Sequence, residues 1–474
     1  MTSDSSSNPF SPKRHESVEQ RQDVGRAARR QVPRTAHREW TPQDNRSDPV
    51  RLLEEQNEVR VPWLVPVRHA RMRVSPFTFF RGTARIMAAD LATTPNSGLQ
   101  VQLGGDAHLS NFGAYASPER QLVFDANDFD ETLPGPWEWD VKRLAASFTV
   151  AAQHLGFGRK EAQQATTTAV RAYRKAMTDY ATMGFLDLWY DRFSVQDLQA
   201  AEDIDPKELA KRLERFGRRA RTRTSLQALQ KLTEEVDGRF RIRSDPPLLV
   251  PMRELRDEAD PASLEEAVRI GFEQYKATLP DNRRSLVERF IPIDMAIKVV
   301  GVGSVGTRCF VMLLEGRDRD DPLFLQIKEA GPSVLEEHLG ASAYPNSGQR
   351  VVEGQQLAQA QSDIFLGWAE GRLSRQFYIR QLRDWKGTVE IEKATTINQM
   401  AFYAQLCGRT LARGHARSGD AASIAAYLGG GDIFDRAISD FSEAYAAQNL
   451  RDYDAFITAI NDGRLECAAP ETTG

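Results

Sequence analysis

The chain has 474 residues and a formal net charge of −4, with 41% hydrophobic and 27% charged residues. This length allows two or three domains with a large core, and the small negative charge gives no overall reason to expect nucleic acid or an anionic membrane as a partner. The three cysteines lie far apart and form no CxxC pair, which argues against a zinc site and fits a reducing compartment. With no signal peptide and no apolar run near the ~20 residues of a membrane span, we expect a cytoplasmic protein.

The N-terminal residues 1–50 are rich in Ser, Pro, Arg and Gln and contain few apolar residues, which predicts a largely disordered tail. The Arg-rich stretch over residues 26–38 could be a solvated tail or an interaction arm, and composition favours the solvated tail. After Asp48 the apolar residues recur at helical spacing, behind an Asp cap and a proline at the first helical position. A helical region is therefore predicted to begin near residue 51.

Arg81 lies between an aromatic cluster and a second helical pattern within residues 61–95. A guanidinium suits bidentate binding of anions, so Arg81 could contact a phosphate group. Pairing with a core carboxylate such as Asp90 is an equally good interpretation of the same residue. The sequence leaves both open.

The central stretch, residues 104–148, holds the residues with the clearest chemistry. Asp106 and Asn111 lie five residues apart behind a short apolar run, and Asp128 and Asp130 follow another. A carboxylate and a carboxamide on one tight loop, with a further Asp delivered by a hairpin, can bring together a general base and metal ligands. Taken alone, Asp-x-x-x-x-Asn is a common loop pattern, because Asp and Asn favour turns and caps. The added hairpin carboxylates favour the functional interpretation.

Helical patterns continue after residue 148, followed by a strongly charged segment over residues 201–245 that contains the basic run KRLERFGRRARTR. Such a run is more often a solvated helix face than a binding patch. Asp245-Pro246-Pro247 then indicates a break and a domain boundary.

Residues 294–330 read as strand, glycine turn, strand, hairpin and strand. A lone GxGxxG is weak evidence, but here a β-rich run follows the glycines, which favours a kinase-type phosphate loop over a dinucleotide-binding turn. The backbone N–H groups of this turn could then approach phosphate oxygens, and the third strand would offer a lysine to the same phosphates. The residues concerned are Gly301, Gly303, Ser304, Gly306 and Lys328.

The lysine of such a strand usually pairs with a glutamate on the next helix. The helical pattern over residues 350–361 offers Glu353, and Glu336 and Glu337 on a shorter segment are the alternatives. Residues 376–382 read as a strand, after which Gln381–Asp384 would form a hinge beside an adenine base.

The acidic motifs also resemble a known group of enzymes. Gly105-Asp106-x-His108-x-x-Asn111, Asp128-Phe129-Asp130 and Trp139-Asp140 are similar to the run HGD-x-H-x-x-N…DF[DE]…D-L-A of aminoglycoside and choline kinases. One departure is Gly104, which stands where that run has its first His, a residue that mainly supports the loop. The resemblance implies ATP and Mg²⁺ as cofactors, Asp106 as the base, and Asn111, Asp128 and Asp130 as metal ligands.

The chain from Pro33 to Asp462 further resembles the bacterial family called domain of unknown function 2252. The pattern of that family includes SPF-x-FFRG, GDAHLSNFG, NDFDET and LARGHARSGD, all of which occur here. Since the activity of the family is unassigned, this resemblance by itself implies no reaction.

The motif order differs from that of ordinary kinases, in which the glycine loop and lysine precede the catalytic loop. Here they follow it, at residues 301–328 against 106–130, and the LARGHAR helix that would lead into the catalytic loop lies near the other end of the chain. We interpret this order as a circularly permuted kinase-like fold, because permutation is tolerated where chain ends are exposed and close together. His415 and Asp420, at the end of that helix, are then expected beneath the catalytic loop.

The predicted fold class is α+β, with two lobes. Residues 51–246 and 386–474 would form a helical lobe, and residues 247–385 a small β-rich lobe with the glycine loop and Lys328.

The predicted function is an ATP- and Mg²⁺-dependent phosphotransferase. Nine residues separate Asp130 from Asp140, too few for a peptide-reading activation loop of ~20 residues, so we expect a small hydroxyl- or amine-bearing acceptor. Two alternatives remain: a non-catalytic nucleotide-binding regulator, and a metal-dependent phosphoesterase, for which a second His-Asp pair is missing. The sequence does not indicate an oligomeric state.

Overall fold

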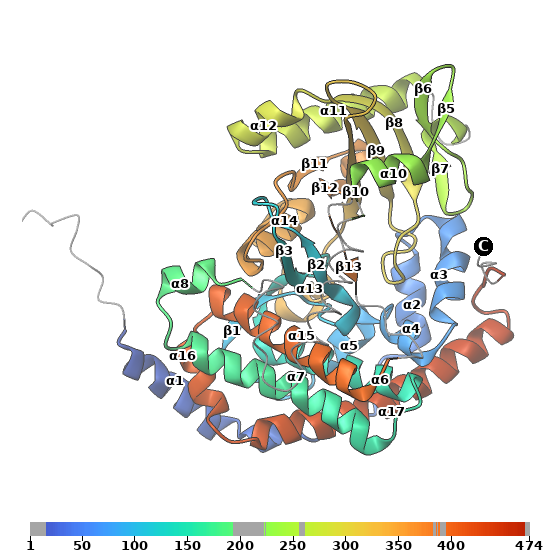
Figure 1. Cartoon of the computed structure of the whole chain (residues 1–474). Coiled ribbons are helices and arrows are strands. Elements are labelled where there is room, and N and C mark those ends of the chain that lie inside the picture. Colours follow the sequence, from blue (N-terminus) through green and yellow to red (C-terminus); the bar gives the residue numbers. More distant parts are fainter. Residues whose placement is uncertain are drawn as a thin grey trace, which may run out of the picture.

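The computed structural model describes residues 16–192, 222, 224–255, 261–382, 385, 387–388 and 395–469 of the chain, with residues 261–265 described by their backbone alone. Nearly all of the basic run in the charged segment, and residues 383 and 384 of the expected hinge, lie outside these ranges. The fold is a mixed α+β arrangement, as predicted (Figure 1). Among the described helices, none combines the length and the hydropathy that a membrane crossing requires.

The main sheet has six antiparallel strands in the order β11-β12-β10-β9-β8-β7 (Figure 1). These are β7 (Leu249–Pro251), β8 (Ile291–Lys298), β9 (Cys309–Glu315), β10 (Pro322–Ala330), β11 (Gly367–Glu370) and β12 (Gln376–Gln381). Helices α11 (Pro261–Thr278) and α12 (Asp281–Val287) cover one face of this sheet. The other face packs against α10 (Ser225–Leu232) and the hairpin of β5 (Thr233–Val236) and β6 (Arg239–Ile242).

This packing moves one predicted boundary. Residues 225–246 were assigned to the helical lobe, but α10 and β6 share a hydrophobic core with the main sheet. The proline pair at 246–247 therefore lies within a packed unit and does not separate two units. Composition could not reveal this, because the partners of α10 come from strands far along the chain.

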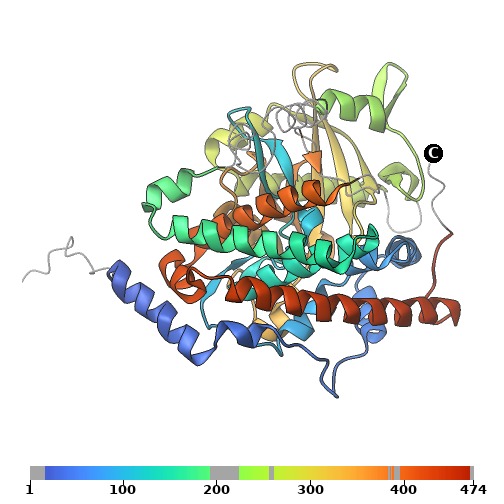
Figure 2. The same cartoon turned by 60° about the horizontal axis from the view of Figure 1, so that its bottom comes forward.

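The helical region is built from two separate stretches of sequence. Its long helices are α6 (Trp137–His154), α7 (Arg159–Tyr180), α15 (Ile397–Ser418) and α17 (Ile433–Asn461), with the shorter α8 (Phe185–Tyr190) and α16 (Ala421–Leu428). Figure 2 shows α7, α15 and α17 lying along one another. A Cβ atom at Gly408 of α15 would lie 2.1 Å from the carbonyl oxygen of Ala169 in α7, so glycine is required for this close approach. Both stretches contribute to one core.

A chain that ends at residue 393 should therefore fail to fold into soluble protein. It would lose α15–α17, which share the main core with α6 and α7, and the remaining helices would expose that apolar surface. Size-exclusion chromatography of the expressed fragment measures this. Co-expression of residues 394–474 as a separate chain is the matched control and should restore soluble material. A soluble, monomeric 1–393 fragment would contradict the shared core.

Short strands connect the helical region with the main sheet. β1 (Gln100–Leu103) pairs with β4 (Leu133–Pro136), and β2 (Phe112–Ala116) lies between β3 (Leu122–Ala126) and β13 (Gly387–Thr388). After β10 follow α13 (Glu336–Leu339) and α14 (Ser347–Ala358), and α14 contacts both β12 and α15. The acidic residues of the central stretch therefore lie on loops between these short strands.

The N-terminal residues are more ordered than the sequence predicted. Residues 1–50 were expected to be a largely disordered tail, but α1 (Val18–Gln31) starts at a capping box formed by Ser17 and Gln20 and packs along α16. A short η1 helix (Arg34–His37) follows and contacts α17. Polar composition misled the prediction because a narrow stripe of small residues is enough to dock this helix.

His37 anchors this segment between aromatic rings. Its Nε2 lies 2.7 Å from the Tyr427 hydroxyl, and its ring packs edge-on to Phe434. Burial lowers the pKa of His37 from 6.5 to about 3, with a smaller contribution from Lys142. Because the folded-state pKa is the lower one, the unfolded chain binds more protons below about pH 6.5. The stability that this histidine contributes is therefore present above that pH and is lost on acidification.

We expect His37→Phe to reduce the dependence of stability on pH. Near pH 5 the free energy of unfolding should fall with acidification less steeply in the variant than in the natural protein. The two slopes should differ by about 1.4 kcal/mol per pH unit, because the variant takes up one proton fewer on unfolding. Urea unfolding at pH 7, 6 and 5 measures both slopes. Equal slopes in the two proteins would contradict the lowered pKa.

The remaining N-terminal helices pack against the glycine turn of the main sheet. They are α2 (Pro49–Asn57), η2 (Pro62–Leu64), α3 (Val65–Met72), α4 (Pro76–Phe80) and α5 (Ala84–Leu91). Val302, in the middle of the glycine turn, is buried in a cluster with Leu53, Met72 and Phe79. The backbone N–H of Val61 donates to the carbonyl of Gly306 at 2.8 Å. The glycine turn is thus held on the helical region.

Candidate active site

A cavity of about 450 Å³ lies where the glycine turn meets the central stretch. Its wall includes the predicted residues Asp106, Asn111, Asp128, Asp130, Gly301, Gly303 and Ser304. Gly306 lies at the end of the same turn, and Lys328 reaches the cavity through its contact with Asp130. The structure thus brings together predicted site residues that are about two hundred positions apart in the chain.

Asp106 is oriented by an arginine from α6. Both Nε and Nη2 of Arg143 donate to Oδ1 of Asp106, at 2.9 and 2.7 Å. Arg143 is itself buried, donates to the carbonyl of Phe80 and stacks on that ring at 4.0 Å. Since Oδ1 takes both donors, Oδ2 is the atom left to accept a proton from a bound molecule.

Sequence reasoning missed Arg143. Its signal was present, because Arg143 stands beside the apolar residues Leu144 and Ala145 of one helix, and a buried Arg needs an acidic partner.

His108 sits beside this carboxylate as a neutral group. The backbone N–H of Ser110 donates to its Nδ1 at 3.2 Å, so the ring proton is on Nε2, 3.7 Å from Oδ2 of Asp106. Burial lowers the pKa of His108 to about 4, which more than offsets the opposing effect of Asp106. At neutral pH this histidine shapes the loop without adding positive charge.

Asn111 is fixed by its own loop. Its Nδ2 donates to the backbone carbonyl of Asp106 at 2.8 Å, which leaves the Oδ1 atom for a ligand. The N–H of Asn127 donates to the carbonyl of Asn111, tying the loop to the end of the β2–β3 hairpin. Asn111 and Asp128 therefore present oxygen atoms to the same cavity.

The two carboxylates of the hairpin end are not equivalent. Asp130 accepts hydrogen bonds from Nζ of Lys328 and from the hydroxyl of Tyr378, each at 2.6 Å. The carboxylate of Asp128 lies 3.5 Å from the same Nζ. Burial and the neighbouring Asp128 raise the pKa of Asp130, and Lys328 opposes the shift. Asp128, with a side chain that is one-third exposed, is the less engaged by Lys328.

Lys328 does not pair with Glu353, as the sequence led us to expect. Within the described ranges its charged partners are Asp130 and Asp128. Burial lowers the pKa of Lys328, but these two carboxylates raise it by more, so the lysine stays charged. Helix α14 instead contributes Arg350, which donates to the carbonyl oxygens of Asp130, Thr132 and Gly331.

The two alternative glutamates are engaged elsewhere. Glu336 accepts the N–H of Ser333 and lies 3.7 Å from Arg350, and Glu337 pairs with Arg85. Helix α14, the second helix after the lysine strand, thus directs a cation to the hairpin end, whereas the sequence predicted that it would offer a glutamate to Lys328. Lys328 instead pairs with Asp128 and Asp130 at the end of the hairpin.

A buried acid and histidine support the Asp106 loop from below. Asp140 accepts the N–H groups of Gly104 and Gly105 at 2.7 and 3.0 Å, and Nε2 of His415 lies 3.2 Å from the same carboxylate. Gly105 has φ +82°, and a Cβ there would lie 2.2 Å from a backbone oxygen of Glu131. The tight turn therefore requires glycine.

His415 lies where it was expected, whereas Asp420 does not. Asp420 caps α16 and pairs with Arg21, away from the loop. The intervening Gly419 takes an extended conformation, with its N–H bonded to the carbonyl of His415. The chain therefore turns away from the loop directly after α15.

We expect His415→Leu to destabilise the fold by about 1–3 kcal/mol, because the buried Asp140 carboxylate loses a donor. His415→Gln keeps an N–H group and serves as the matched control, with a smaller loss. Urea unfolding of the three proteins at pH 7 measures the difference. Equal stability of the Leu variant and the natural protein would show that this contact does not support the loop.

The structure excludes Asp90 as the partner of Arg81. Asp90 pairs with Arg46 and accepts the hydroxyl of Tyr445, so it is not the partner of Arg81. Arg81 instead lines the cavity near Asp106, and in the described part of the chain its buried Nε has no hydrogen-bond partner. Burial lowers its pKa, and Asp106 opposes this.

The expected hinge is engaged within the protein. The N–H of Gln381 donates to Asp363 and that of Leu382 to the carbonyl of Phe324. Beside them Arg380 donates to Gln326 and to the carbonyl of Asn127. These two N–H groups are therefore not available to a base in this conformation.

The donors in the cavity suit a hard cation that arrives with phosphate groups. Mg²⁺ uses one or two carboxylates, with substrate oxygens and waters for the rest. Asp128 provides one carboxylate, and Asn111 adds a carboxamide oxygen. Across the described ranges no group of three or more His, Cys, Asp or Glu side chains is placed to hold a metal ion by itself.

These features define an α+β protein in which a glycine turn and an acidic loop line one cavity, with the buried Lys328 bonded to Asp130 in its wall. The family model described as an uncharacterized protein conserved in bacteria (DUF2252) matches residues 60–459, so the chain belongs to that family. Comparison with curated proteins and with solved structures found no match.

Proposed function

We propose that the protein is an ATP- and Mg²⁺-dependent phosphotransferase that acts on a small hydroxyl- or amine-bearing acceptor. The observation that carries this proposal is the shared cavity. It combines the glycine turn with Asp106, Asn111 and Asp128, and Lys328 lies at hydrogen-bonding distance from Asp130 in its wall. Phosphoryl transfer requires these parts and little covalent chemistry from the protein.

The order of elements in the main sheet supports a kinase-like fold. A strand, a glycine turn, a second strand, a third strand with a lysine, the helices α13 and α14 and two further strands succeed one another from β8 to β12. Protein kinases use the same sequence of glycine loop, lysine strand and helix. The acidic loops precede these elements in the chain and the α15 helix follows them, which is the order a circular permutation would produce.

Each residue of the cavity can be given a role. Asp106 would accept the proton of the acceptor through Oδ2, while Arg143 holds its other oxygen. Asn111 and Asp128 would hold Mg²⁺, which when bound neutralises charge on the phosphates. Lys328 would move from Asp130 to a phosphate oxygen, and the glycine turn would cover the phosphates with its N–H groups. Asp130 would then be free to assist Asp128.

The acceptor is expected to be small because nine residues separate Asp130 from Asp140, too few for a peptide-reading activation loop. Arg60, Arg81 and Arg85 of the N-terminal helical segment form the wall that faces Asp106 and the glycine turn. Arg60 also donates to the carbonyl of Val305, fixing this wall to the turn.

A non-catalytic nucleotide-binding regulator is the second candidate. The N–H groups of Gln381 and Leu382 are engaged within the protein, and Arg380 bridges the sheet to Asn127 next to Asp128. A nucleotide base that used these two N–H groups would require their contacts to rearrange in the phosphotransferase and in the regulator alike, so turnover is what distinguishes the two. The phosphoesterase is less favoured, because two-metal hydrolysis needs more protein ligands than this cavity offers.

Calorimetric titration of ATP in the presence and absence of Mg²⁺ tests binding, and ADP release with a panel of small alcohols, sugars and amines tests turnover. We expect binding that requires Mg²⁺ and turnover that requires an acceptor. Binding without turnover for every acceptor would favour the regulator. The absence of Mg²⁺-dependent binding at millimolar ATP would overturn the proposal.

A further inference from the structure

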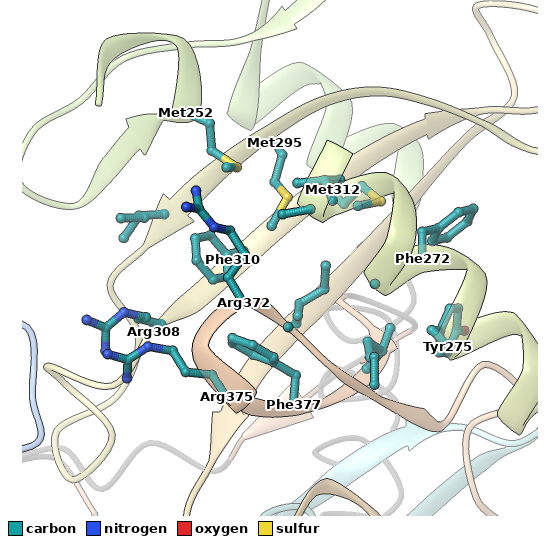
Figure 3. Close-up of a pocket in the computed structure, with 18 of the residues that line it drawn as sticks. Met252, Phe272, Tyr275, Met295, Arg308, Phe310, Met312, Arg372, Arg375 and Phe377 are labelled. Atoms are coloured by element: carbon teal, nitrogen blue, oxygen red, sulfur yellow. The ribbon is translucent and has the colours of Figure 1, made fainter. Parts of the chain in front are cut away.

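A second cavity, of about 310 Å³, lies on the opposite face of the main sheet from Lys328 (Figure 3). On β10 its wall is formed by Leu325 and Ile327, which alternate with Gln326 and Lys328 and therefore point to the other face. Helix α11 closes one side with Phe272 and Tyr275. This cavity is thus separate from the proposed active site.

The wall of this sheet-face pocket is mostly apolar. Strands β8, β9 and β12 add Met295, Phe310, Met312 and Phe377, and Figure 3 shows these side chains converging on one space. They belong to the hydrophobic core under α11, yet they leave a volume in the range of small-molecule sites. An apolar wall with few polar groups is typical of a ligand site.

The polar groups of the pocket are concentrated at one end. Arg308, Arg372 and Arg375 lie together there, away from Phe272 and Tyr275 (Figure 3). Glu329 accepts from Arg375 at 2.8 Å and lies 3.4 Å from Arg308, and Glu370 is the other acidic residue nearby. Three guanidinium groups face two carboxylates, so this end carries a net positive charge.

We propose that the sheet-face pocket binds an amphipathic anion, a medium-chain carboxylate whose alkyl chain lies along the sheet and whose head pairs with Arg308 and Arg375. The apolar end accounts for the chain and the guanidinium end for the charge, since guanidinium groups suit bidentate pairing with carboxylates. Neither half of the pocket would recognise a cation or a strongly polar molecule.

Glu329 connects the sheet-face pocket with the proposed active site. Glu329 follows Lys328 on β10 and lines the first cavity, and its Oε2 accepts the backbone N–H of Arg308 directly after the glycine turn. An anion that pairs with Arg308 and Arg375 competes with Glu329 for both. As a consequence that rests on the proposed function, the ligand should change the affinity for Mg²⁺-ATP.

Calorimetric titration of octanoate, decanoate and laurate, each below its micelle concentration, tests the site directly and needs no nucleotide. Each added CH₂ should tighten binding roughly fourfold while the chain still fits, from ~0.8 kcal/mol per CH₂ and ~1.36 kcal/mol per tenfold. Decanol and decyltrimethylammonium have the same tail without the negative charge. Both should bind at least about tenfold more weakly than decanoate.

Two variants locate the site. Gly271 of α11 lines the pocket, and a Cβ there meets nothing within 4 Å, so Gly271→Leu should place its side chain in pocket space and weaken decanoate binding at least roughly tenfold. Arg269→Leu, on the exposed side of the same helix, is the matched control and should bind normally. Arg375→Gln should weaken the binding of decanoate but not that of decanol. This variant still tests the proposal if Gly271→Leu folds poorly.

Several results would overturn the proposal. These are no binding at millimolar decanoate, equal affinity for the three decyl compounds, or binding that neither variant changes. Dimerisation of the natural protein that Gly271→Leu abolishes would assign the apolar face to a second copy of the chain instead. The effect of decanoate on the affinity for Mg²⁺-ATP tests only the coupling between the two sites. If decanoate binds but does not change this affinity, the sheet-face pocket is still supported as a binding site and the coupling is rejected.

Discussion

Replacing Asp106 by Asn is expected to lower turnover by roughly 10²–10⁴-fold while leaving the affinity for Mg²⁺-ATP nearly unchanged. The amide keeps an oxygen for Arg143, so the loop should hold its shape. It loses the basic Oδ2 that would take the proton of the acceptor. Single-turnover rates with an identified acceptor, together with calorimetric titration of Mg²⁺-ATP, separate the two effects.

Glu337→Gln is the matched control, because this carboxylate lines the same cavity but pairs with Arg85. It should leave the rate of transfer nearly unchanged. Loss of nucleotide binding in Asp106→Asn, with the control intact, would show that Asp106 belongs to the nucleotide site and not to the acceptor.

Replacing Asp128 by Asn should have the opposite pattern and weaken Mg²⁺-ATP binding itself. Even outer-shell partners of metal sites contribute about 10–100-fold in metal affinity, so loss of a charged ligand should cost at least roughly tenfold. The affinity for ATP without Mg²⁺ should change much less, because Lys328 and the glycine turn remain. Titration of Mg²⁺ at fixed ATP measures this difference.

Asp130→Asn is the informative comparison for Asp128. Asp130 is held by Lys328 and Tyr378, so its loss should release the lysine and have a smaller effect on the Mg²⁺ requirement. A larger effect from Asp130 than from Asp128 would reverse the assignment of the metal ligand. Unchanged Mg²⁺ affinity in both variants would remove the metal from this cavity.

Local sequence patterns predicted the elements of the site well. Asp106, Asn111 and Asp128 follow short strands on tight loops, and the glycine turn joins two strands, as their spacing indicated. Loop geometry depends on near neighbours, so residue types and short spacings are sufficient to predict it. The long helix that contains His415 was recognised for the same reason, from its apolar periodicity.

Errors arose where an outcome depended on distant partners. The tail was predicted to be disordered because composition ignores the contacts of α1 with α16, and the boundary at 246 ignored the packing of α10 on the sheet. Glu353 was chosen as the partner of Lys328 from the usual order of kinase elements. Here α14, the second helix after the lysine strand, directs Arg350 to the hairpin end, and the lysine pairs with that end as well.

The sequence by itself thus determined which candidate functional groups this protein carries: a loop with Asp106 and Asn111, a hairpin end with two carboxylates, a glycine turn and Lys328 on a strand. Only the tertiary structure decided which of these atoms meet. Lys328 and Asp130 are 198 residues apart, and Arg143 was not singled out until the structure placed it against Asp106. The physical reason is that a buried charge must find an opposite charge wherever packing brings one, and sequence separation does not constrain that choice.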